Sequence, residues 1–188
     1  TDNYYMQMVQ NIRRYKGVRP IPEGKGVKQI ELGDFDAWKT VTPTYYDTKG
    51  DVTHRDFPGY SGLHYTDNSG RNDIVGAKVA RDADNVYFYV ETAEALTPST
   101  DHNWMMLFID TDRNKATGWN GYDFVVNYAS PRNGKAVVQK SYQDKWIWKD
   151  AADVDMRVDG NKLVIAIPRS VLGTTDALNF EFKWCDNM

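Results

Sequence analysis

Residues Trp104–Tyr128 read WMMLFIDTDRNKATGWNGYDFVVNY: an apolar run, a loop rich in oxygen-bearing side chains, and a second apolar run. The first run is apolar at consecutive positions, which is typical of a strand buried on both faces. The second run continues after the loop with Phe124, Val126 and Tyr128. The stretch therefore predicts two strands of a β protein, joined by a loop of the kind that often carries binding residues.

Alternating apolar residues predict further strands on both sides of this stretch. VYFYVE at 86–91 alternates between two faces, and Asp159-Gly160 is a strong hairpin signal between two apolar segments. Residues 178–184 alternate strictly, which predicts a half-buried strand. The side chains of this strand that are predicted to face the core are Leu178, Phe180, Phe182 and Trp184. Strands at spacings of about 8–14 residues predict an all-β fold, an antiparallel, jelly-roll-like β-sandwich.

The first residues follow a different pattern. Apolar side chains at Tyr5, Met8, Val9 and Ile12 fall on one face of a helix. We expect a helix over residues 1–17 that is the tail of a preceding, catalytic-type domain, a linker over 18–29 with two prolines and two glycines, and the sandwich over 30–188. The last predicted strand would leave one edge open, so we expect the sandwich to continue beyond residue 188.

Composition narrows the classes of function. The net charge is −3 with no basic block, so nucleic-acid binding is not expected. Apolar runs are too short for a membrane span, and no signal peptide is visible. Cys185 is the only cysteine, which excludes an internal disulfide and leaves the compartment open. Aromatic residues make up 13% of the chain, an excess that hints at a binding face.

The loop after the first apolar run carries possible metal ligands. The candidate ligands are Asp110, Asp112, Asn114 and Asp123. The first three have the 1-3-5 spacing of a calcium loop, but Lys115 and Gly121 stand where an EF-hand needs Gly and Glu. A second interpretation remains open, a tight turn whose Asp and Asn side chains accept hydrogen bonds from backbone N–H groups.

Two pairs of rings are candidates for sugar binding: Trp119 with Tyr122, and Trp146 with Trp148. The first pair lies beside glycines and offers either a stacking surface or the lid of a small hydrophobic cluster. The second pair shares one face of a strand, with Ile147 opposite, and forms either an exposed platform or part of the core. Trp38 and Trp184 are expected in the core, since their strand neighbours are apolar.

Several motifs in order resemble family 9 carbohydrate-binding modules and their relatives. They are DFDAW at 34–38, AKVARDADNVYFYVETAE at 77–94, WMMLFIDTDRN at 104–114 and DGNKLVIAIPRSVLG at 159–173. The segment DTDRNKATGWNGYDF at 110–124 looks like modules appended to glycoside hydrolases of gut-type bacteria. The leading segment NYYMQMVQNIRRYKG is similar to the last helix of a catalytic barrel in such enzymes.

The resemblance implies a β-sandwich, often calcium-bearing, that binds polysaccharides or oligosaccharides through aromatic side chains. It implies a noncatalytic module that follows a catalytic domain in a bacterial glycoside hydrolase, located outside the cell, in the periplasm or on the surface. No catalytic residue is predicted in this chain, because no Ser-His-Asp order, GxSxG or phosphate loop occurs. Two alternatives remain open: a spacer sandwich with no ligand, and a fragment of a glycoside hydrolase whose catalytic residues lie outside this chain.

Overall fold

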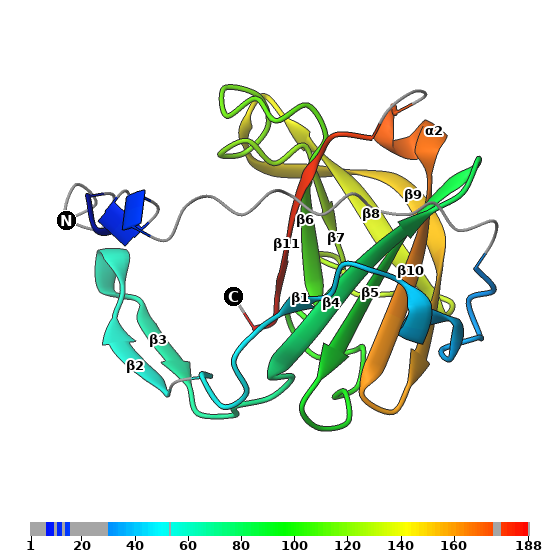
Figure 1. The fold of residues 1–188 in the computed structure, drawn as a ribbon. Helices are drawn as coiled ribbons and strands as arrows, with labels where there is room; N and C mark the ends of the chain where they lie inside the picture. Colours follow the sequence, from blue (N-terminus) through cyan, green and yellow to red (C-terminus); the bar gives the residue numbers. More distant parts are fainter. Residues whose placement is uncertain are drawn as a thin grey trace.

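The computed structural model describes residues 7–9, 11–12, 14–15, 30–52, 54–174 and 178–187. In this part of the chain, nine strands form one antiparallel sheet in the order β1-β4-β5-β10-β9-β8-β7-β6-β11, and β2 and β3 form a separate hairpin (Figure 1). The sheet is curled, so the predicted all-β, sandwich-like fold is confirmed.

The strands of the large sheet are β1 (Tyr45–Tyr46), β4 (Ile74–Arg81), β5 (Asn85–Thr92), β6 (Met106–Asp110), β7 (Phe124–Val126), β8 (Lys135–Tyr142), β9 (Lys145–Asp159), β10 (Lys162–Pro168) and β11 (Glu181–Cys185). The hairpin consists of β2 (Arg55–Pro58) and β3 (His64–Asp67). Short helices in the described part of the chain include η1 (Ala37–Thr40), η2 (Tyr60–Gly62) and α2 (Arg169–Leu172).

Strand β9 divides the sheet into two halves. Its residues 145–155 pair with β8, and its residues 156–159 pair with β10. The first half is therefore β1-β4-β5-β10, and the second half is β8-β7-β6-β11. The two halves face each other, because Phe182 of β11 contacts Phe88 of β5 and Tyr45 of β1, with ring centroids 5.7 and 5.4 Å apart.

The inner core fills the space between the halves. Apolar side chains of β5 and β10 from the first half meet those of β6, β7, β8 and β9. Phe180, Phe182 and Trp184 pack against this core, while Glu181 and Lys183 are exposed. The predicted inward side of this segment is confirmed, but the strand is shorter than predicted, because β11 begins at Glu181 and Leu178 and Phe180 precede it. Its apolar side chains are only partly buried, because β11 is an edge strand with a neighbour on one side alone.

The outer face of the first half is covered by the segment 30–41. Trp38 of η1 lies flat on Tyr89 of β5, with ring centroids 5.0 Å apart and an angle of 22° between the planes. Lys78 of β4 donates a hydrogen bond from Nζ to the carbonyl oxygen of Trp38, at 2.6 Å. Ile30 and Val41 complete this cover, so Trp38 is buried as predicted.

Two segments extend away from this body. The β2–β3 hairpin projects from it (Figure 1). Residues 7–9, 11–12 and 14–15 are helical, but Met8 and Ile12 are 50% and 48% exposed, so the face predicted to be buried is not covered here. Tyr5, on the same predicted face, and the predicted linker 18–29 lie outside the described residues. No helix in the described ranges is long and apolar enough to cross a membrane.

The contacts between the two halves predict how much stability is lost when a buried ring between them is removed. Phe88 is fully buried and touches both Phe180 and Phe182. Replacing Phe88 by Ala should lower the free energy of unfolding by about 3–5 kcal/mol, because it leaves a cavity where the halves meet. The matched control is Phe57→Ala on the exposed hairpin, which should change stability by less than about 0.5 kcal/mol. Urea denaturation of both variants tests this, and equal losses would contradict the described core.

Candidate functional site

The outer face of the second half carries a group of aromatic rings. Met106, Phe108 and Val125 point away from the inner core, yet they are buried because other side chains cover them. We call this group the outer aromatic cluster. Its members are Phe108, Trp119, Tyr122, Tyr128, Trp146 and Trp148.

The structure brings all four predicted sugar-binding rings together around Phe108. The centroid of the Phe108 ring lies 5.9 Å from Trp119, 5.3 Å from Tyr122, 5.9 Å from Trp146 and 6.1 Å from Trp148. Two of these rings come from the loop between β6 and β7, and two come from the start of β9. The pairs that the sequence presents separately therefore form one surface feature.

Trp146 and Trp148 lie on the outer face, as the platform interpretation expects, and not in the core between the halves. Their rings are 5.5 Å apart and nearly perpendicular, at 84°. The pairing of β8 with β9 is irregular here, since Tyr142 pairs with Lys145 and Ser141 already pairs with Trp148. Ile147 lies within this irregularity and is exposed, so its side chain is left outside the inner core.

Tyr128 also joins the cluster, although the sequence predicted it as part of the strand that starts at Phe124. The predicted length of that strand is wrong. Strand β7 ends at Val126, and Asn127 has a φ of 62°, which turns the chain. Tyr128 then lies against Trp146, with centroids 5.2 Å apart at 76°. These two rings are 38% and 36% exposed, which makes them the most exposed rings of the cluster.

Glycines allow the β6–β7 loop to place its rings. Trp119 and Tyr122 exchange two backbone hydrogen bonds of 2.9 Å across Asn120-Gly121, a tight turn with φ values of 51° and 93°. Gly118 has a φ of 64°, and a Cβ atom there would lie 2.2 Å from the carbonyl oxygen of Tyr122. Its N–H donates to Asp144 in the β8–β9 turn, at 2.8 Å, which ties the loop to the hairpin that carries Trp146.

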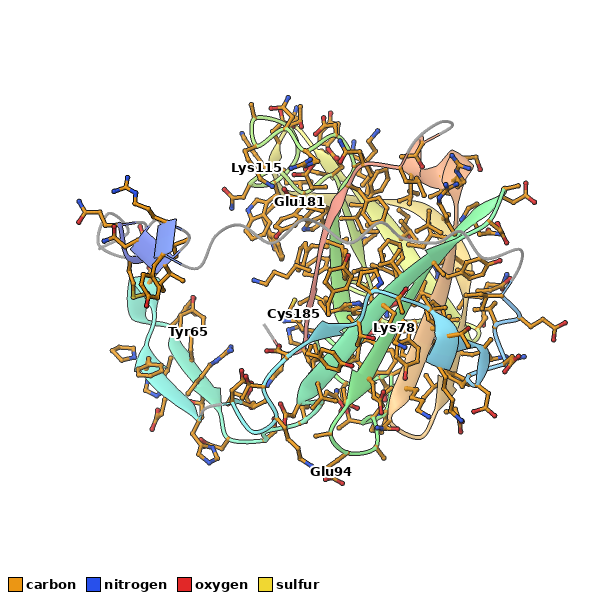
Figure 2. The ribbon with its side chains drawn as sticks, viewed as in Figure 1. Tyr65, Lys78, Glu94, Lys115, Glu181 and Cys185 are labelled. Atoms are coloured by element: carbon orange, nitrogen blue, oxygen red, sulfur yellow. The ribbon has the colours of Figure 1, made fainter. Side chains whose placement is uncertain are left out.

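The base of the same loop contains a buried carboxylate. Asp110, at the end of β6, is fully buried, and its Oδ1 accepts a hydrogen bond of 2.6 Å from the N–H of Arg113. Its Oδ2 accepts one of 2.7 Å from Nζ of Lys115. Nζ also donates to Oε2 of Glu181 at 2.7 Å, and Figure 2 shows Lys115 and Glu181 side by side. Lys115 therefore connects the loop to the edge strand β11.

The ionisation of these groups follows from their contacts. The pKa of Lys115 is raised by its hydrogen bonds to Asp110 and Glu181. The pKa of Glu181 is lowered by the same ammonium group, and that of Asp112 by the backbone N–H of Asn114. Because the carboxylate pKa values are depressed, their contribution to stability is present at neutral pH and is lost on acidification.

The loop contains the hydrogen bonds expected of a tight turn, in which Asp and Asn side chains accept from backbone N–H groups. Asp112 accepts from the N–H of Asn114 at 2.8 Å and from the hydroxyl of Thr117 at 2.9 Å. Asn114 is a predicted metal ligand, and here its Oδ1 accepts from the N–H of Ala116 at 3.1 Å. These contacts fix the loop through its own donors.

Three of the four predicted ligands also meet the requirement for a metal site. Carboxylate oxygens of Asp110, Asp112 and Asp123 lie within 4.8 Å of one another, so this cluster could hold a metal ion. Asp123 stands at the other end of the loop, where its Oδ2 accepts from the N–H and hydroxyl of Thr111 at 2.8 and 2.7 Å. The cluster therefore joins the two ends of the loop that carries Trp119 and Tyr122.

Comparison with protein-family models, with curated proteins and with solved structures gives no match for this chain.

The loop geometry predicts different costs for two glycine substitutions. Gly118 and Gly134 both have positive φ, at 64° and 72°, but only the Cβ at Gly118 would meet another atom within 4 Å. Gly134→Ala should lose about 1–2 kcal/mol of stability from backbone strain alone. Gly118→Ala should lose about 1–3 kcal/mol more, because the new methyl group clashes with the backbone of Tyr122. Thermal and urea unfolding measure the difference, and equal losses would contradict the described loop.

Proposed function

We propose that this chain is a noncatalytic carbohydrate-binding module that binds its sugar on the outer aromatic cluster. The observation that carries the proposal is the convergence of rings from two distant segments on one outer face of the sheet, with Trp146 and Tyr128 partly exposed. The resemblance to family 9 carbohydrate-binding modules supports it. On the same ground, we propose that the module serves a secreted or surface glycoside hydrolase of bacterial origin.

The chemistry of sugars explains why such a cluster suits them. A pyranose ring has one weakly apolar face of C–H groups, and its hydroxyls already bond well with water. A binding protein gains affinity by offering a flat aromatic surface to the C–H face. The rings of the cluster hold one another in place. The ring centroid of Trp146 lies 4.4 Å from that of Trp119 and 5.2 Å from that of Tyr128. Little side-chain entropy is then lost when a sugar binds.

Loss of one exposed ring should weaken sugar binding. We expect Trp146→Ala to lower the affinity for oligosaccharides from xylan, mannan or glucan by about 5- to 150-fold, corresponding to a loss of about 1–3 kcal/mol with one stacking ring. Isothermal titration calorimetry measures this affinity. The matched control is Tyr60→Ala, which removes an even more exposed ring from the β2–β3 hairpin and should bind sugars as well as the wild type.

Two outcomes would overturn this function. If the wild type binds no sugar at millimolar concentration, the chain acts as a spacer without a ligand. If Trp146→Ala binds like the wild type while its melting temperature is unchanged, the sugar site lies elsewhere on the molecule.

For the metal, we propose calcium as the ion held by Asp110, Asp112 and Asp123. The support is that calcium prefers carboxylate oxygens and tolerates irregular geometry, and that these oxygens lie within 4.8 Å of one another. The ion would compete for Asp110 with the ammonium group of Lys115, which contacts the same carboxylate at 2.7 Å. Binding of calcium therefore requires that this ammonium group moves away.

Calcium binding should be visible in thermal unfolding. A ligand that binds only the native state raises the melting temperature, so EDTA should lower it in the wild type and have no effect on Asp112→Ala. Lys115→Met should increase the stabilisation by calcium, because the competing ammonium group is absent. Identical melting curves with calcium and with EDTA, in both the wild type and Lys115→Met, would show that the carboxylates serve the turn alone.

A further inference from the structure

We propose that the sugar bound by the outer aromatic cluster is a neutral oligosaccharide, and that it runs along β9 from the rings to a polar group centred on Asp150. This inference rests on the proposed function and adds the class of ligand. The polar group contains Arg132, Gln139, Asp150 and Asp153, and we call it the polar end of the site.

Strand β9 places the rings and the polar end in one line. Trp148 pairs with Ser141 of β8, and Asp150 pairs with Gln139, in regular register. Residues two apart on a strand point to the same side, about 7 Å from each other. Asp150 therefore follows Trp148 on the outer face. The line from Trp146 through Trp148 to Asp150 is longer than one pyranose ring, so it fits a chain of sugars.

The loop between β7 and β8 borders the same line. Tyr128, at its start, contacts the ring of Trp146, and Arg132, further along, reaches Asp150. Between them, the N–H of Ala129 donates to Oε1 of Gln139 at 3.2 Å, which fixes the loop over β8. One loop thus supplies an exposed ring and an exposed cation to neighbouring parts of the site.

The polar end is held in place before any ligand binds. Gln139 is only 7% exposed, and its Nε2 donates to Oδ1 of Asp150 at 2.9 Å. Arg132 donates from Nη2 to Oδ2 of Asp150 at 2.9 Å, and from Nε to both oxygens of Asp153 at 3.0 Å. Groups held in this way accept and donate hydrogen bonds to a ligand with little loss of entropy.

The charges at the polar end select against acidic sugars. One guanidinium group, that of Arg132, is shared by two carboxylates, those of Asp150 and Asp153, so this group of three carries a net negative charge. The side chains of Arg132 and Asp150 are about half exposed, so they remain accessible to sugar hydroxyls. Carboxylates accept hydrogen bonds from hydroxyls but repel uronates and sulfates.

The test compares sugars of increasing length on wild type and variants. Calorimetry uses the neutral xylan, mannan and glucan series, from monosaccharide to hexasaccharide, and a uronate oligosaccharide. Asp150→Asn should weaken the longer neutral sugars by about tenfold, the usual loss with one charged hydrogen bond, and leave the monosaccharide unchanged. The control, Asp155→Asn, removes another exposed carboxylate of β9, one that pairs with Lys135, and should bind every sugar like the wild type.

The outcomes separate this inference from the proposed function. If Trp146→Ala abolishes sugar binding but Asp150→Asn binds all lengths like the wild type, the polar end is not part of the site and this inference is wrong alone. Stronger binding of the uronate than of the neutral series by the wild type would also overturn it. If the wild type binds no sugar, the proposed function fails as well. Tighter uronate binding by the double variant Asp150→Asn, Asp153→Asn than by the wild type would support the charge argument.

Discussion

Strand β9 pairs with β8 along most of its length and with β10 at its end, and this shared strand determines the rest of the architecture. A flat sheet of nine strands would leave one apolar face in water. The sheet curls instead, with β9 passing from one half to the other, and the apolar faces of β5 and β6 are buried against each other in one inner core. The contacts of Phe182 with Phe88 and Tyr45 then bring the two edges of the sheet together.

The curled sheet has two outer faces, and different segments of the chain cover them. The outer face of the first half is covered by the segment 30–41, with Trp38 on Tyr89. The outer face of the second half is covered by rings from the β6–β7 loop and from β9. These rings form the outermost layer of this face, and part of their area stays in contact with solvent, most of all at Tyr128 and Trp146. In the described part of the chain, the second face is the one on which several rings gather with part of their surface exposed.

The cation at the base of the loop links stability to the proposed site. Lys115 joins the buried Asp110 to Glu181 on the edge strand, and the same loop carries Trp119 and Tyr122 a few residues later. A buried carboxylate without partners is costly, and Asp110 is paired with the ammonium group of Lys115. In the described structure the chain supplies that cation itself. The proposed calcium site would exchange one cation for another at the same carboxylate.

The sequence by itself determined the strands and their inward faces, since apolar alternation in VYFYVE and in residues 178–184 follows directly from the period of a strand. It also identified Trp119, Tyr122, Trp146 and Trp148 as candidate rings. Only the tertiary structure decided that these rings form one cluster, because the loop and β9 meet through pairing of strands far apart in the chain.

Tertiary structure also decided the roles of residues whose local pattern was misleading. Tyr128 was predicted to belong to the strand that starts at Phe124, but that strand ends at Val126 and a positive φ at Asn127 turns the chain. The partnership of Arg132 with Asp150 depends on a loop that folds back across β8. Local periodicity cannot predict such contacts, because they depend on which segments the curled sheet brings side by side.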